Sequence, residues 1–189
     1  SPECQPFFDA ARLRWAGNEV AVGVAGEDRR IDRLVLLDDG CWWVLDYKLG
    51  ASPEREPAYL AQMRGYVAAG GTLVCEGLPG YFGDRGKVGV KQPNYGLDGL
   101  FGARESYVEF TPDLLEKLTL QVRGQQVGGR YFVQQYELAG GTKAGEFAGG
   151  AVAAVENRVG KGRTLLIGTF PGAAYFLHHG AGTRAFFAG

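Results

Sequence analysis

The chain has 189 residues, of which 46% are hydrophobic and 12% aromatic, and its formal net charge is -1 at pH 7. This composition is ordinary for a globular protein and excludes a disordered chain, and the length suffices for one substantial core or two small ones. The near-zero charge gives no bulk basic footprint of the kind that nucleic-acid-binding proteins usually carry.

The cysteines and the hydropathy pattern bear on location. Cys4, Cys41 and Cys75 are odd in number and widely spaced, so they indicate neither a disulfide framework nor a zinc site. No run approaches the roughly 18 apolar residues of a membrane span, and the first residues lack a signal-peptide pattern. We therefore expect a reducing, cytoplasmic location and no membrane partner.

The stretch RIDRLVLLDDGCWWVLDYK, residues 30–48, predicts a β-hairpin because two apolar runs flank the turn DDG. With Gly40 at the positive-φ position, the residue before the turn faces the residue after it. Counting outwards from the turn, Asp32 lies opposite Asp46, and Lys48 lies on the same face. A salt bridge would explain one aspartate, whereas Mg²⁺ or Mn²⁺ would compensate both.

These residues resemble the D…DYK core of PD-(D/E)XK nucleases, in particular the RecB-type nuclease domain of UvrD/Rep-like DNA helicases. The resemblance extends upstream through FFDAARLRWAGNEVAV and downstream to PAYLAQMRGY. It implies that Asp32, Asp46 and the backbone carbonyl of Tyr47 ligate Mg²⁺ or Mn²⁺, and that Lys48 helps to activate the attacking water. DNA is then the implied substrate, and the chain a metal-dependent deoxyribonuclease.

A helix is predicted from Pro57 towards Gly70, with Gln62 and Tyr66 at i and i+4. The nuclease resemblance implies that this pair supports the site and touches DNA. Alternatively, Tyr59, Met63 and Tyr66, which are spaced as one face of the helix, simply pack in the core. We favour this core role for Tyr59 and Met63.

Two features of the first segment leave its activity open. RecB-type nucleases usually add an acidic residue or histidine from an upstream helix. Here Glu19, on an expected strand, is the only nearby candidate, and we interpret it as a structural acid. The segment also contains a cluster of basic residues, which either form a solvated charged surface or contact DNA. They are Arg29, Arg30, Arg33, Lys48, Arg55 and Arg64.

Glycine usage changes along the chain, with 6 glycines in residues 1–66 and 25 in residues 67–189. This boundary predicts two segments, residues 1–69 and 70–189. In the second, GTLVCE and GRTLLIGTF are apolar runs suited to buried parallel strands. KLTLQVRG, GRYFVQQYEL and AVAAVENRV alternate like strands of a partly exposed sheet.

The second segment carries GGTLVCEGLPGYFGDRGKVGVKQPNYGLDGLFGARESYVEFTP and, later, GGAVAAVENRVGKGRTLLIGTFPGAAYFLHH. These motifs resemble the trimerisation domain of family 42 β-galactosidases, which has a class I glutamine-amidotransferase-like, flavodoxin-like fold. The resemblance implies a non-catalytic domain that packs subunits together, hence a homo-oligomer. The predicted class is α/β: a mixed sheet with a nuclease-like hairpin and helix, followed by a partial flavodoxin-like segment.

In both resembled families a helix ends at the position of RGYVAAGGTLV, so this junction fits either pattern. This overlap favours a composite chain in which two segments have been joined. Cys75 with His178 and His179 superficially matches an amidotransferase, but the Gly-x-Cys-x-Gly elbow is absent. GKGR, residues 160–163, lacks the P-loop pattern and is interpreted as a turn.

Three hypotheses follow. The leading one is metal-dependent DNA hydrolysis by the first segment, fused to a non-catalytic α/β domain. The second is an inactive structural or oligomerisation module related to family 42 β-galactosidases, in which the aspartate cluster is a relic. The third is an accessory piece of a glycosidase.

Overall fold

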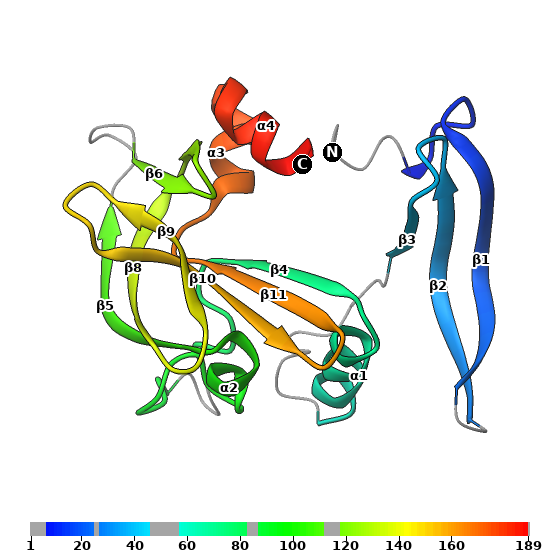
Figure 1. Cartoon of the computed structure of the whole chain (residues 1–189), viewed down its shortest axis with the longest axis horizontal. Helices are drawn as coiled ribbons and strands as arrows, with labels where there is room; N and C mark the ends of the chain where they lie inside the picture. Colours follow the sequence, from blue (N-terminus) through cyan, green and yellow to red (C-terminus); the bar gives the residue numbers. More distant parts are fainter. Residues whose placement is uncertain (1–6, 25–26, 46–56, 83–86, 112–117, 189) are drawn as a thin grey trace. The chain divides into compact units, whose positions relative to one another are not determined.

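The computed structural model describes residues 7–24, 27–45, 57–82, 87–111 and 118–188. The chain divides into two compact units, Ser1–Ala51 and Ser52–Gly189. Figure 1 shows the helices and strands of each unit. The division precedes the helix that the nuclease resemblance includes, so this helix belongs to the second unit.

The first unit is an antiparallel sheet in the order β1-β2-β3, formed by β1 (Leu13–Val24), β2 (Glu27–Leu37) and β3 (Trp42–Leu45). Consecutive antiparallel strands joined by short turns need no crossover, so this order follows from the chain order. Two aromatic pairs stack on it, Trp15 with Trp42 and Phe7 with Trp43, at ring-centroid distances of 5.6 and 5.1 Å. Both hairpin tryptophans nevertheless stay about half exposed.

The second unit is built around a six-stranded mixed sheet in the order β4-β11-β10-β9-β6-β7. Its strands are β4 (Thr72–Glu76), β6 (Thr119–Val122), β7 (Gln125–Gly128), β9 (Thr142–Phe147), β10 (Val152–Val159) and β11 (Gly162–Ile167). β4 and β11 pair in parallel, and the other described pairs are antiparallel. A separate two-stranded ladder joins β5 (Ala103–Thr111) to β8 (Tyr131–Leu138).

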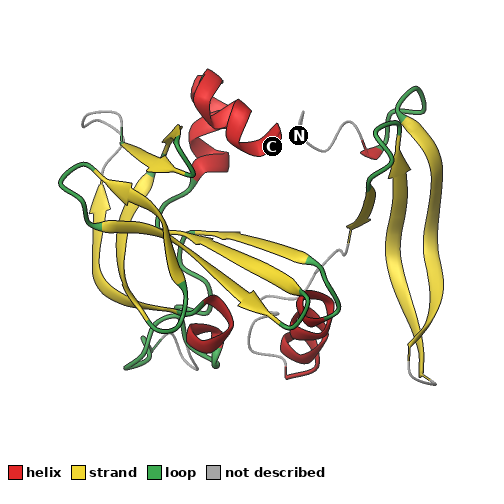
Figure 2. Cartoon of the chain, in the orientation of Figure 1, coloured by secondary structure: helices red, strands yellow, loops and turns green. Residues whose placement is uncertain are grey.

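The helices of the second unit are α1 (Pro57–Ala68), α2 (Leu97–Phe101), α3 (Pro171–His178) and α4 (Ala181–Ala188). α1 and α2 contact the β10–β11 part of the sheet, whereas α3 and α4 contact β7. Figure 2 shows these two helix pairs at opposite ends of the unit's strands. None of the described helices is both long enough and apolar enough to cross a bilayer.

Both faces of the central strands are covered, which explains the apolar run in GRTLLIG. One core cluster contains Leu166 and Val155 together with Phe101 of α2 and Leu60 of α1. The other cluster contains Leu165 together with seven further buried apolar side chains, which are Leu120, Val122, Val127, Phe147, Ala153, Ala154 and Ile167. Strands that are covered on both faces have continuous apolar sequences rather than alternating apolar and polar residues.

The predicted α/β class is confirmed at this level. GTLVCE and GRTLLIGTF form the parallel pair β4 and β11, and the predicted helix extends from Pro57 to Ala68. The expected burial is wrong for β4, in which Val74 is 50% exposed because β4 is an edge strand of the sheet. The three alternating stretches form β6, β8 and β10. The nuclease-like and flavodoxin-like details of the fold remain predictions.

Candidate functional site

The turn of the β2–β3 hairpin has the predicted register. Gly40 has φ +83°, and the amide of Leu37 donates a hydrogen bond of 3.0 Å to the carbonyl of Cys41. The ladder continues without a shift as far as the pair Arg33–Leu45. The next residue of β2 is Asp32, so the observed register leads to the pairing that the sequence predicts.

The other members of the predicted metal site lie outside the described residues. Asp46, Tyr47 and Lys48 follow the last described residue of β3, so the Asp32–Asp46 pairing stays a prediction. Asp32 itself is partly buried on β2. Within the described part of the chain, no three His, Cys, Asp or Glu side chains converge as metal ligands would.

Glu19 is an exposed acid on β1 that pairs with a basic side chain. The flanking pairs of the β1–β2 ladder place it across from Asp32, with its backbone at φ +51°. Its Oε2 lies 3.3 Å from Nη1 of Arg30, and both side chains are more than 60% exposed. Glu19 therefore has a nearby guanidinium partner, in a pair that water screens.

Gln62 and Tyr66 lie on α1, in the second unit, and bind each other. Nε2 of Gln62 donates to the Tyr66 hydroxyl oxygen at 2.8 Å, as i,i+4 spacing allows. The expected core role is correct for Met63, which packs against the first core cluster, and wrong for Tyr59, which is 40% exposed. The reason is helical phase: Leu60 faces the sheet, and its chain neighbour points away.

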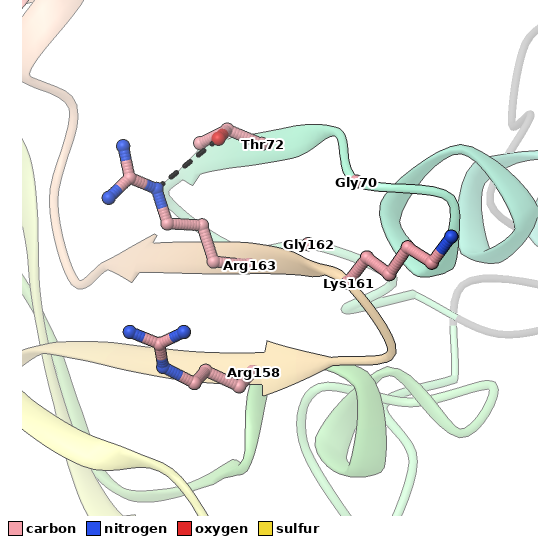
Figure 3. A pocket seen from close by; sticks show the side chains of 6 residues that line it. All are labelled: Gly70, Thr72, Arg158, Lys161, Gly162 and Arg163. Carbon is pink, nitrogen blue, oxygen red and sulfur yellow. Dashed lines mark hydrogen bonds between the residues drawn. The ribbon is translucent and has the colours of Figure 1, made fainter.

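A basic pocket of about 340 Å³ lies where the β10–β11 hairpin meets the start of β4 (Figure 3). It is lined by Gly70, Thr72, Arg158, Lys161, Gly162 and Arg163. In Figure 3 the guanidinium groups of Arg158 and Arg163 extend to one side, and Lys161 extends towards α1. Nε of Arg163 donates to the hydroxyl oxygen of Thr72 at 3.3 Å.

Strand pairing explains how the pocket assembles. Arg158 pairs directly with Arg163 across the antiparallel β10–β11 ladder, and Arg163 pairs with Thr72 across the parallel β11–β4 ladder. Gly162 is required because a Cβ there would lie 2.0 Å from the carbonyl oxygen of Val67. The sequence interpretation of GKGR as a turn is correct, but it missed the pocket. A hairpin register centred on Gly160 and Lys161 could have placed the two arginines opposite each other.

A row of hydrogen-bonded side chains lies on the β5–β8 ladder. The Tyr136 hydroxyl donates to Oε1 of Gln134 at 2.7 Å, and Nε2 of Gln134 donates to Oε2 of Glu105 at 2.5 Å. Burial raises the pKa of Tyr136, so this phenol stays protonated and acts as the donor. These hydrogen bonds satisfy polar groups that would otherwise be costly to bury.

Cys75 is unsuited to nucleophilic chemistry. Burial, with the charge of Glu76 as a lesser cause, raises the pKa of its thiol to about 12. The thiol therefore carries its proton at neutral pH, whereas a nucleophilic cysteine needs a lowered pKa. His178 and His179 end α3, and the side chain of His179 stacks edge-on against Tyr175. This geometry gives no support to amidotransferase chemistry.

Glu76 closes the carboxyl end of β4 against the start of α3. Its Oε2 accepts a hydrogen bond of 2.7 Å from the backbone N–H of Gly172. Burial raises the pKa of this carboxyl, and the Gly172 hydrogen bond opposes the rise. Glu76 thus satisfies an otherwise unpaired amide at a helix N-terminus.

No protein-family model and no curated protein sequence matches this chain. Solved structures of β-galactosidases do resemble it. They include a β-galactosidase from Bacillus circulans sp. alkalophilus (14% identity, TM-score 0.55) and one from the haloarchaeon Halorubrum lacusprofundi (21%, 0.55). A third is a catalytic mutant of Gan42B, a GH42 β-galactosidase from G. stearothermophilus (20%, 0.52).

These likenesses cover 70%, 69% and 60% of this chain but only 21%, 19% and 17% of the respective β-galactosidase chains. At such identities they establish a shared fold alone. The predicted resemblance to family 42 β-galactosidases is thereby confirmed as a likeness of fold. The nuclease resemblance of residues 1–69 finds no support in these comparisons and stays a prediction.

Proposed function

We propose that this chain acts through its second unit as a structural module related to the trimerisation domain of GH42 β-galactosidases, and that it associates with further copies of itself. The observation that carries the proposal is the fold likeness, which covers most of this chain and about a fifth of the β-galactosidase chains. A segment that corresponds to so small a part of a large enzyme fits a supporting domain better than a complete catalytic one.

An exposed apolar surface on α3 and α4 supports association. Phe176, Leu177 and Phe187 are 66%, 52% and 44% exposed, and we call them the C-terminal apolar surface. Large apolar side chains that gather on two adjacent helices are typical of interaction sites, whereas singly scattered ones are not. A second copy of the chain would remove them from water.

Sedimentation equilibrium of the whole chain tests this proposal. We expect a mass that rises with concentration above the 20.3 kDa of one chain, towards three copies. The double variant Phe176→Ser/Leu177→Ser should shift the association to higher concentration. Val90→Ser, which removes a fully exposed apolar side chain from a loop, is the control and should leave association unchanged. A constant 20.3 kDa at all concentrations would refute the proposal.

A second candidate function is metal-dependent hydrolysis of DNA by residues 1–69, with Asp32, Asp46 and Lys48 in the roles given above. The specific observation in its favour is the β2–β3 register, which leads towards the Asp32–Asp46 pair. Two carboxylates at that spacing provide the oxygen ligands that Mg²⁺ prefers. The metal would lower the pKa of a bound water and neutralise phosphodiester charge.

Cleavage of labelled single- and double-stranded DNA in Mg²⁺ or Mn²⁺ tests this candidate. Activity that disappears in Asp46→Ala, yet persists in a control such as Glu137→Ala at an exposed position of β8, is the expected result. If the wild-type chain leaves DNA intact in both metals and binds neither metal, the candidate is excluded.

A further inference from the structure

The two arginines of the basic pocket form a like-charged pair that the fold itself does not require. Arg158 and Arg163 are exposed and lie directly opposite each other on adjacent strands. Side chains at such positions have Cβ atoms about 4.5 to 5.5 Å apart, and like charges there repel. This arrangement lowers stability unless something negative lies between the two groups.

Among the described residues, no carboxylate supplies that charge. Across the described residues, none of Arg158, Arg163 and Lys161 forms an ion pair. Glu156, two residues before Arg158 on β10, is instead held by Arg123 at 2.8 Å. Within the part of the chain that the structure describes, the repulsion between the two guanidinium groups is therefore not compensated by an ion pair.

Lys161 has a structural explanation that the arginines lack. Its backbone N–H donates to the carbonyl of Ala68, the last residue of α1, at 2.9 Å. A cation at a helix C-terminus is favoured by the helix dipole, so Lys161 would be stabilising there without any ligand. Arg158 and Arg163 lie on β-strands and gain nothing from that dipole.

We propose that the basic pocket binds the phosphate group of a small-molecule ligand. Arg158 and Arg163 offer planar guanidinium groups suited to bidentate binding of tetrahedral oxyanions. The Thr72 hydroxyl accepts from Nε of Arg163, which leaves its own proton to be donated to the anion. Two guanidinium groups on the same side of the pocket match a polyvalent anion better than a single carboxylate.

This inference is independent of the assembly proposal, because the pocket lies on β4, β10 and β11 and the C-terminal apolar surface lies on α3 and α4. The test is isothermal titration of the whole chain with pyrophosphate and inorganic phosphate. Wild-type protein should bind with one site per chain, and Arg158→Gln and Arg163→Gln should each weaken binding by about tenfold or more. Arg184→Gln is the matched control, because it removes an equal charge from exposed α4.

Stability measurements guard against misfolded variants. Because each substitution removes a repulsion, the thermal midpoint of Arg158→Gln and Arg163→Gln without ligand should not fall below that of the wild type. At equal concentration, pyrophosphate should raise the wild-type midpoint more than those of the two variants.

Two outcomes would overturn the proposal. The first is the absence of saturable binding of both phosphates to the wild-type chain. The second is binding that Arg184→Gln weakens as much as the pocket variants do, since this would show a diffuse charge effect. A single-stranded oligonucleotide is titrated in parallel. If it binds through the same arginines while pyrophosphate does not, the small-molecule assignment is wrong.

Discussion

Both units contain strands with apolar sequences, but β11 of the second unit is buried whereas β3 of the first unit is about half exposed. In β11 of the second unit, Thr164, Leu165, Leu166 and Ile167 are each at most 1% exposed, because helices and other strands cover both faces. In β3 of the first unit, Trp42, Trp43 and Val44 are 56%, 46% and 47% exposed. An apolar run therefore predicts a strand, but burial depends on whether another layer of the fold is available.

Core truncation should reveal the largest difference between the units. Phe101 is 1% exposed and packs in the first core cluster, so Phe101→Ala should lower the free energy of unfolding by about 3 to 5 kcal/mol. Trp42→Ala in the first unit should cost only about 1 kcal/mol, since it removes mainly the contact with Trp15. Urea unfolding followed by circular dichroism measures both free energies of unfolding. Equal losses in the two variants would show that the two units do not differ in how well their apolar side chains are packed.

Thiol labelling gives the next largest effect. In a Cys4→Ser/Cys41→Ser background, Cys75 should resist alkylation at pH 8 in the native protein and react after unfolding in urea. Its pKa of about 12 leaves little thiolate, and the side chain is partly buried. The converse background, in which Cys41 alone remains, should label in the native state because Cys41 is exposed. Rapid native labelling of Cys75 would instead favour amidotransferase-like chemistry.

A smaller effect is expected at Glu76, whose pKa is raised by burial. The unfolded chain loses this proton near the ordinary value of 4.5, and the folded chain loses it at higher pH. Between these values the native state binds more protons, so stability falls as pH rises and stays lower above the window. Glu76→Gln should therefore stabilise the protein at pH 7 and have little effect at pH 4.

The measurement for Glu76 is urea unfolding at both pH values, with Glu137→Gln at an exposed position of β8 as the control for the general change in charge. If Glu76→Gln destabilised the protein at pH 7, the hydrogen bond to Gly172 would outweigh the burial of the charge.

The smallest expected effect concerns an exposed ion pair of the first unit. Nη2 of Arg12 lies 2.9 Å from Oδ1 of Asp38, and this hydrogen bond lowers the pKa of Asp38. The stabilisation is present above the ordinary pKa and lost as pH falls through the lowered value. Asp38→Asn should cost little, because exposed pairs are screened by water and salt.

Tryptophan fluorescence measures this effect selectively, since the three tryptophans of the chain all lie in the first unit. A fluorescence-detected unfolding midpoint of Asp38→Asn that equals the wild-type value at pH 7 and in low salt would show that the ion pair contributes nothing.

Local signals accounted for much of the fold. The turn DDG with Gly40 fixed the hairpin register, and Pro57 marked the start of α1. The exposure of Tyr59 was missed because helical spacing identifies a stripe but not its exact phase against the sheet. The basic pocket was missed because it joins β4 to β11, and this pairing links residues about ninety positions apart.

Hydrogen exchange of the whole chain, measured at low and high protein concentration, tests most directly whether the second unit is the part that assembles. The account predicts that exchange of residues 171–188 slows at high concentration while exchange of β1, β2 and β3 stays constant. Concentration-dependent protection confined to the first unit, or no change anywhere in the chain, would contradict it.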